Sequence, residues 1–273
     1  MPRVAANGIE LYYEERGHGE PLLLMAPTGW PGSVWDLEQT AFFSQTHRVI
    51  TYDYRGVGRS DQPDEPYSTA LLAEDALALL HAIGAAPAHV LGFSMGGRAA
   101  QIMALESPQS VRSLILAASD AGSPHGGGGV PFELAVQLAE FGYRDHWPSH
   151  LNGEFPLSPG FRAQHPEKVQ ALMDCILANC APPKLYLRHV VARGSHYTGD
   201  RLGEISVPTL VLVGAEDRRE RGSGDHVEAG QKLAAQITNA EFATVAGARH
   251  LFLWEAPELG NRAILDFIQR HQQ

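Results

Sequence analysis

The chain has few of the features that mark disulfide-rich, membrane or nucleic-acid-binding proteins. It holds two cysteines in 273 residues, which are too few for a disulfide framework. No apolar run approaches the roughly 20 residues that span a bilayer, and the N-terminus lacks the apolar core of a signal peptide. The formal charge of −10 disfavours nucleic acid and anionic membranes as partners. We therefore expect a cytoplasmic protein with free thiols.

The chain does have enough apolar residues for a sizeable core, at 44% hydrophobic and 19% charged. Strand-like and helix-like segments alternate through its first part. The expected strands lie at 3–15 (two short strands), 21–25, 48–52, 89–91 and 111–118, and the expected helices at 33–43 and 69–83, with Thr69 as the cap of the second. This alternation predicts a mostly parallel α/β sheet covered by helices.

The alternation breaks at a run of four glycines, residues 126–129. After it the pattern predicts three helices and no strand, and prolines punctuate the segment. The helices are expected at 132–141, 167–178 and 184–193. Strands at 207–213 and 240–245 and a helix at 258–270 then resume the sheet. We expect a core of residues 1–123 and 203–273, with a helical lid of residues 124–202 inserted after the sixth strand.

One short motif organises the rest of the chain, Gly92-Phe93-Ser94-Met95-Gly96-Gly97. It lies between an apolar strand and an alanine-rich helix, and Gly-x-Ser-x-Gly in that setting is the nucleophile elbow of serine hydrolases. The glycines allow the tight turn that holds the serine hydroxyl clear of the backbone. The backbone N–H of Met95, which follows the nucleophile, is the expected donor to an oxyanion.

A serine hydroxyl needs a base to take its proton, and the base needs a carboxylate to orient it. Asp217 follows the strand at 207–213, and His250 follows the strand at 240–245, in the chain order of such triads. Both lie where strands of an open α/β sheet end. Asp120, just past the strand at 111–118, is the rival acid.

Four ordered motifs resemble those of the α/β-hydrolase superfamily, in its lid-bearing branch of esterases, lactonases, haloperoxidases and carbon–carbon bond hydrolases. They are Asp53-x-Arg55-Gly56-x-Gly58, the elbow, Gly214-x-x-Asp217 and Gly247-x-x-His250. The resemblance implies the α/β-hydrolase fold, the triad Ser94, Asp217 and His250, and no cofactor. It also implies that Arg55, Gly56 and Gly58 form a structural loop.

The chain departs from this family in the loop after its third strand. Members usually carry His-Gly there, whereas this chain has Thr28-Gly29-Trp30. In that register the backbone N–H of Trp30 is the second oxyanion donor, and Thr28 takes the place of the histidine. The Trp30 ring either packs in the core or contacts substrate.

Residues of the expected lid are weaker candidates for function. Trp147 is either lid core or, with Thr28, wall of the substrate pocket. His146 and His150 are spaced four apart, as metal ligands on a helix can be, but Pro148 lies between them and no third ligand is evident. We therefore expect no metal site.

Three functions fit these residues. The first is hydrolysis of a small or medium carboxylic ester or lactone, in which His250 takes the Ser94 proton and later gives it to the leaving alcohol. The second is carbon–carbon bond hydrolysis of a ring-fission diketone, which requires an arginine facing Ser94. Its candidates, Arg98, Arg188 and Arg193, each read better as surface residues. The third is a non-catalytic ligand-binding protein on the same fold. A small molecule is the expected partner in each case, and a homo-oligomer stays open.

Overall fold

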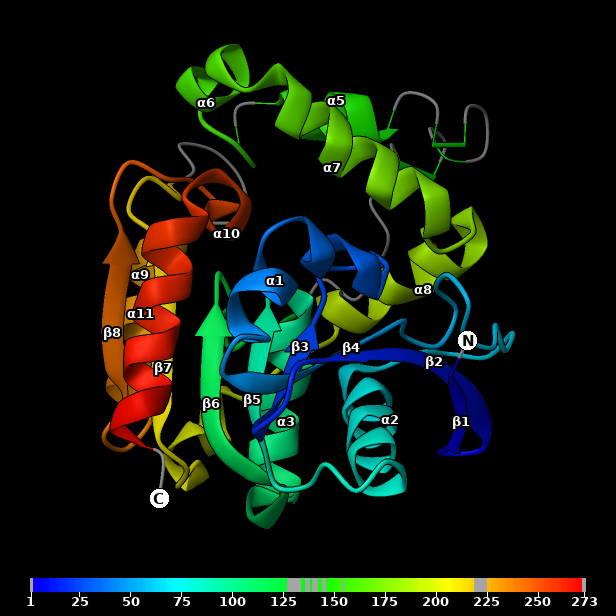
Figure 1. Ribbon diagram of the computed structural model, residues 1–273, viewed down its shortest axis with the longest axis vertical. Helices are drawn as coiled ribbons and strands as arrows, with labels where there is room; N and C mark the ends of the chain where they lie inside the picture. The colour runs from blue at the N-terminus through cyan, green and yellow to red at the C-terminus, as the bar shows by residue number, and fades with distance from the viewer. Residues whose placement is uncertain are drawn as a thin grey trace.

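A computed structural model describes residues 2–126, 134–135, 138, 142–143, 146–153, 155–218 and 225–271. Its centre is an eight-stranded sheet in the order β1-β2-β4-β3-β5-β6-β7-β8. The pairs β1–β2 and β2–β4 are antiparallel, and every other neighbouring pair is parallel. Helices flank the sheet on its sides (Figure 1). None of the helices in the described residues is long and apolar enough to cross a membrane.

The strands and helices follow one another as the sequence predicts for most of the chain. The strands are β1 Arg3–Ala6, β2 Ile9–Arg16, β3 Glu20–Met25, β4 His47–Tyr52, β5 Ala88–Phe93, β6 Val111–Ala117, β7 Thr209–Gly214 and β8 Glu241–Val245. The core helices are α1 Gln39–Phe43, α2 Thr69–Ala82, α3 Met95–Glu106, α9 His226–Gln236, α10 Phe252–Glu255 and α11 Pro257–Arg270. Short 3-10 turns span Gly32–Leu37, Pro108–Ser110 and Gly199–Glu204.

The central parallel strands form because their residues are apolar on both faces. All six residues of β5 and of β7 are buried, as are the last four of β3. Parallel strands covered by helices bury both faces and therefore lack polar alternation. Because these strands run parallel, the loops after them meet at one edge of the sheet.

Between β6 and β7 the chain forms helices and no strand within the described residues. These are α5 His146–Asn152, α6 Pro159–Gln164, α7 Pro166–Asn179 and α8 Pro183–Gly194. The strand arrows of β6 and β8 point toward α5, α6 and α7 (Figure 1). The inserted helices thus lie beyond the carboxyl ends of the strands, over the region that should hold the site.

Three local expectations need correction. Ser68, rather than Thr69, caps α2, because its side chain accepts a hydrogen bond from the N–H of Leu71. The helix expected at 33–43 divides into a 3-10 turn and α1, with Glu38 between them. The helices α5 and α6 were not expected, because each is short, α5 contains Pro148, and α6 begins at Pro159. The helix expected at 132–141 lies largely outside the described residues, as does most of the four-glycine run.

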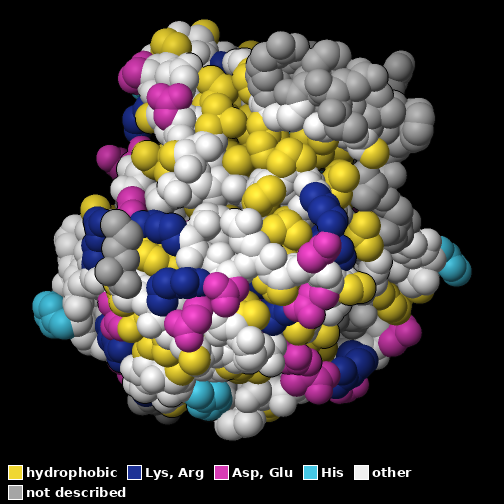
Figure 2. All heavy atoms as spheres, turned by 90° about the vertical axis from the view of Figure 1, so that its right-hand side faces the viewer, with side chains coloured by type: hydrophobic (Ala, Val, Ile, Leu, Met, Phe, Trp, Pro, Cys, Tyr) yellow, Lys and Arg dark blue, Asp and Glu magenta, His cyan; other side chains and the backbone are white. Residues whose placement is uncertain are grey.

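The charged surface and the two free cysteines agree with what the composition predicts. On the face drawn in Figure 2, basic and acidic side chains are interspersed over the lower part, and apolar side chains gather in the upper part. Asp64 joins the core to α8 through ion pairs with Lys184 and Arg188. Cys175 and Cys180 are free, as expected, and both are half-buried.

The elbow motif leaves no room for a side chain at its glycines. A Cβ on Gly96 would lie 2.3 Å from the carbonyl oxygen of Met25, and one on Gly92 would lie 2.5 Å from the carbonyl oxygen of Gly96. Both obstacles are backbone atoms, which cannot rotate away. The close approach of α3 to β3 and β5 therefore depends on these two glycines.

Replacing Gly96 with alanine tests this close approach. We expect G96A to lower the free energy of unfolding by about 3 kcal/mol, because the new methyl group must push strand and helix apart. Urea denaturation followed by circular dichroism measures the change. In the control G160A the nearest atom to the new Cβ lies 4.0 Å away, so stability should change by less than about 1 kcal/mol. Equal effects of the two substitutions would contradict the account.

Candidate active site

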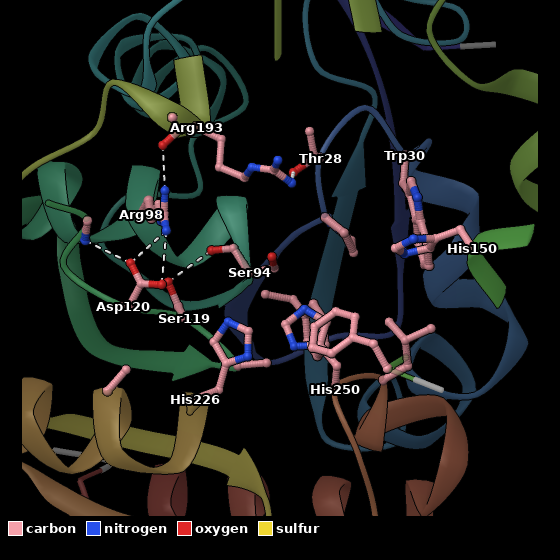
Figure 3. Close-up of a pocket in the computed structure, with 18 of the residues that line it drawn as sticks. Thr28, Trp30, Ser94, Arg98, Ser119, Asp120, His150, Arg193, His226 and His250 are labelled. Atoms are coloured by element: carbon pink, nitrogen blue, oxygen red, sulfur yellow. Dashed lines mark hydrogen bonds and ion pairs between the residues drawn. The ribbon is translucent and has the colours of Figure 1, made fainter. Parts of the chain in front are cut away.

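A cavity of about 530 Å³ opens at the carboxyl ends of the strands. Residues singled out from the sequence line it, among them Thr28, Trp30, Ser94, Trp147 and His250. Segments far apart in the chain meet here because the loops after β3, β5, β6 and β8 leave the same edge of the sheet. Figure 3 shows Ser94 and His250 facing this common space.

Asp217 lies behind His250 and joins it through a hydrogen bond. The Nδ1 atom of His250 is 2.8 Å from Oδ2 of Asp217. Asp217 is only 1% exposed, and burial opposes its ionisation. The nearby charge of His250 and the hydrogen bonds from His226 and His250 outweigh burial and hold the pKa of Asp217 well below its usual range. The carboxylate is therefore ionised and can orient the imidazole.

Ser94 occupies a strained turn between β5 and α3. Its φ of 52° and ψ of −114° lie in a region that residues with side chains rarely adopt. The carbonyl of Ser94 accepts a hydrogen bond from Ser119 Oγ at 2.9 Å, which supports the turn from the loop after β6. The expected order of strand, serine and helix is confirmed. The hydroxyl thus starts at the N-terminus of a helix, where developing negative charge is favoured.

The two expected oxyanion donors differ in their present partners. Met95 is the first residue of α3, and within the described residues its N–H donates to no acceptor. The N–H of Trp30, by contrast, donates to the carbonyl of Pro27 at 3.3 Å. Trp30 can serve an oxyanion only by giving up this long bond. Its role, like that of Met95, stays a prediction.

Asp120, the rival acid, is paired elsewhere. Its carboxylate accepts bonds of 2.7 and 2.9 Å from Nη2 of Arg98 and one of 2.7 Å from the N–H of Gly122. Burial raises the pKa of Asp120, but the charge and hydrogen bonds of Arg98 outweigh burial and lower it below 3.8. Asp217, and not Asp120, is the carboxylate that contacts the His250 ring.

The assignment of Arg98 and Arg193 to the surface was wrong. Both line the cavity together with Ser94, and the side chain of Arg98 is 17% exposed. Arg98 also donates to the carbonyl of Arg193, which joins α3 to the end of α8. Sequence could not reveal this, because it depends on where the inserted segment crosses the core. Arg188 does lie away from the cavity, in an ion pair with Asp64.

Arg193 differs from Arg98 in having no acidic partner. Its guanidinium reaches Thr28 Oγ1 at 3.5 Å, and none of the ion pairs found in the described parts of the chain includes it. Burial lowers the pKa of Arg193, yet an arginine stays charged at neutral pH. Figure 3 shows it extending over the space beside Ser94. The cavity therefore offers a cation to an anionic ligand.

Aromatic rings form the wall opposite these arginines. The ring of Trp30 packs edge-on against Trp147, with centroids 5.9 Å apart, and against Trp254, at 5.7 Å. Trp30 and Trp147 are 2% and 1% exposed. The ring is therefore packed in the core and also lines the cavity, and its contact with substrate stays a prediction.

One further histidine reaches this site, and sequence analysis missed it. His226 begins α9, lines the cavity, and places Nδ1 3.0 Å from Oδ1 of Asp217. The available signal was an Asp225-His226 pair opening an amphipathic helix, with Asp225 as the cap. That signal predicts a helix start, but it does not predict which strand end the histidine faces.

The three residues Asp217, His226 and His250 also offer metal-ligand atoms within 4.8 Å of one another. Both Nδ1 atoms already face the carboxylate at hydrogen-bond distance. A metal ion between them would replace the bond that orients His250. The arrangement thus fits proton transfer better than metal ligation. His146 and His150 stack with ring centroids 6.1 Å apart, and His146 lies 3.3 Å from the hydroxyl of Tyr186.

Comparisons with known proteins agree with the fold and identify the family. A family model described as the alpha/beta hydrolase fold matches residues 22–144. A 2-hydroxy-6-oxononadienedioate/2-hydroxy-6-oxononatrienedioate hydrolase of Paraburkholderia phymatum is 30% identical over 277 residues, covering 97% of this chain and 93% of that protein.

Solved structures are similar over their full length. The enol-lactonase from Burkholderia xenovorans LB400 has a TM-score of 0.86 at 25% identity, covering 98% of this chain and 100% of that one. A thermophilic esterase from Thermogutta terrifontis, with malate bound, has a TM-score of 0.86 at 26% identity, covering 100% of both chains. Relatives named as hydrolases favour catalysis over a ligand-binding role.

The charge pair of Arg98 and Asp120 makes a prediction on stability. The pKa of Asp120 is lower in the folded than in the unfolded protein. Its contribution to the free energy of unfolding is therefore present above the pKa of the unfolded state, about 4, and is lost as pH falls through the pKa of the folded state. We expect D120N to lower the free energy of unfolding by about 1–2 kcal/mol at neutral pH. The difference from the native chain should shrink as pH falls from neutral to below about 4. Urea titrations at each pH measure it, and a difference independent of pH would contradict the assignment.

Proposed function

Because this chain is a hydrolase of the α/β-hydrolase family, we propose that Ser94, His250 and Asp217 form its catalytic triad. The proposed substrate is a small or medium carboxylic ester or lactone. One observation carries the proposal. The His250 ring, bonded to the buried Asp217 at 2.8 Å, shares a cavity with a serine at a strained strand-to-helix turn.

The proposed reaction begins with attack of Ser94 Oγ on the substrate carbonyl. His250 takes the hydroxyl proton, and Asp217 stabilises the imidazolium that forms. The tetrahedral oxyanion accepts hydrogen bonds from the N–H of Met95 and, once released from Pro27, from that of Trp30. The leaving alcohol takes a proton from an imidazolium of the site. Water then hydrolyses the ester between Ser94 and the acyl group, which releases the acid.

The volume of the cavity favours a substrate of modest size. A volume of about 530 Å³ falls within the roughly 300–1,000 Å³ typical of small-molecule sites. The similar enol-lactonase and esterase structures support this bond type. We propose that the inserted helices, residues 124–202, act as the lid over this cavity, with Trp147 and Thr28 in the pocket wall.

A p-nitrophenyl ester series tests the triad. S94A should reduce turnover by at least about a thousandfold, to the level of the buffer reaction. Labelling of Ser94 by a fluorophosphonate should slow by about a thousandfold or more in D217N. The matched control D120N should slow labelling by less than about tenfold, since Asp120 does not contact His250. Unchanged turnover in S94A, or equal labelling of the two aspartate variants, would sink the assignment.

A second candidate function keeps the triad and changes the bond. The Paraburkholderia phymatum relative is named for a dicarboxylate that carries an enol hydroxyl and a ketone. A compound of that kind contains no ester, so its hydrolysis breaks a carbon–carbon bond. Carbon–carbon hydrolysis requires a cation near Ser94 for the anionic substrate, and Arg193 supplies one in the cavity.

Arg193 distinguishes the two functions. If the second candidate holds, the protein consumes 2-hydroxy-6-oxononadienedioate, and R193Q lowers kcat/KM by about 10- to 100-fold through loss of a charged hydrogen bond. Hydrolysis of neutral p-nitrophenyl acetate by R193Q should fall by less than about threefold. Loss of the dienol absorbance measures the first reaction. An inactive native protein, or equal losses on both substrates, would rule the second candidate out.

A further inference from the structure

His226 shares the carboxylate that orients the catalytic base. Its Nδ1 lies 3.0 Å from Oδ1 of Asp217, while Nδ1 of His250 lies 2.8 Å from Oδ2. The side chains of His226 and Asp217 are 12% and 0% exposed. A triad needs only one imidazole on its carboxylate. Both oxygens of Asp217 here hold an imidazole, so the second ring needs an explanation of its own.

The two rings lie side by side and reach the same cavity. Their centroids are 4.9 Å apart with planes inclined at 35°, and both line the space that holds Ser94. In Figure 3 they stand next to each other below Ser94. A carboxylate can accept but not donate, so each Nδ1 carries the proton of its bond. Each Nε2 is then the nitrogen left for proton exchange.

Charged groups surround the pair. The Asp217 carboxylate lies between the two rings and contacts both. Arg98 and Arg193 line the same cavity, and the Asp120 carboxylate there is bonded to Arg98. The ring of Phe155 lies tilted beside both imidazoles, with its centroid 5.6 Å from that of His226 and 4.6 Å from that of His250.

We propose that His226 is a second catalytic residue, the acid that protonates the leaving alcohol and the base that activates water. The proposal rests on the ester or lactone hydrolysis proposed above. In a triad one histidine carries out every proton transfer, whereas here two histidines share the proton transfers. His250 serves Ser94, and His226 serves the leaving group and then the water.

The steps balance when the pair starts with one added proton, on Nε2 of His226. In acylation, His250 Nε2 takes the proton of Ser94 Oγ as the bond from Oγ to carbon forms, and both rings are protonated while the tetrahedral oxyanion balances the second positive charge. The carbon–oxygen bond to the alcohol then breaks, and the alcohol oxygen takes a proton from Nε2 of protonated His226, which leaves one added proton, on His250. In deacylation, neutral His226 takes a proton from water as the water oxygen bonds the acyl carbon. Protonated His250 returns its proton to Ser94 Oγ as that bond breaks, which restores the starting state.

The separate acid predicts which class of substrate the site hydrolyses. A phenolate such as p-nitrophenolate leaves without a proton, so its esters gain little from a separate acid. An alkyl alkoxide, whether from an ester or an opened lactone, is a poor leaving group until it is protonated. The second imidazole therefore points to unactivated alkyl esters or lactones as the substrates of this site.

The test compares two esters of one acid in the variant H226N. Asparagine can place its amide N–H where Nδ1 lies and keep the bond to Asp217, but it cannot exchange a proton. We expect kcat/KM for ethyl acetate to fall by about 100-fold or more, against a loss of less than about fivefold for p-nitrophenyl acetate. The control H150N changes another histidine of the same cavity, and should leave the ratio of the two esters within about twofold.

Each outcome decides a different point. If H226N lowers kcat/KM equally for both esters, His226 only positions Asp217, and if it leaves both unchanged, His226 takes no part in the reaction; either result overturns the proposal. If the native protein hydrolyses neither ester, or if S94A is as active as the native protein, the proposed function fails before His226 is considered. Should H226N not fold, H226Q can be used for the same comparison, because the glutamine amide also cannot act as a general acid or base.

Discussion

The site depends on one buried carboxylate that must stay charged. Asp217 is 1% exposed, and an unpaired charge at such depth would be costly enough to force its protonation. Imidazoles on both of its oxygens, at 2.8 and 3.0 Å, prevent this. The same bonds that keep Asp217 ionised fix the orientation of His250. The hydrogen bond that keeps Asp217 ionised is therefore also the one that orients His250 for proton transfer.

The elbow imposes the second constraint, which is steric. Ser94 can hold its unusual backbone conformation only because β5, α3 and β3 meet without side chains between them. Because these backbone atoms lie so close together, the turn has no room to shift. The packing of the sheet therefore fixes the position of the serine hydroxyl. Strain of this kind is a cost that a scaffold keeps only where it serves a site.

Sequence reasoning succeeded where chain order alone fixes position. Ser94, Asp217 and His250 each follow a parallel strand of the sheet, and parallel strands bring their ends to one edge. It failed where position depends on how separate segments pack. The path of α8 over the core places Arg193 in the cavity, and the start of α9 places His226 on Asp217. No periodicity or spacing encodes either contact. The bond from Trp30 N–H to Pro27 is a local turn that the motif register did not reveal.

Direct detection of the acyl-enzyme tests the central claim, that Ser94 attacks the substrate and holds its acyl group. The protein would be mixed with p-nitrophenyl acetate, quenched in acid during steady turnover, digested and analysed by mass spectrometry. The account predicts an added acetyl group on the peptide that contains Ser94. Turnover with no acetyl group on Ser94, or with the group on another residue, would contradict it.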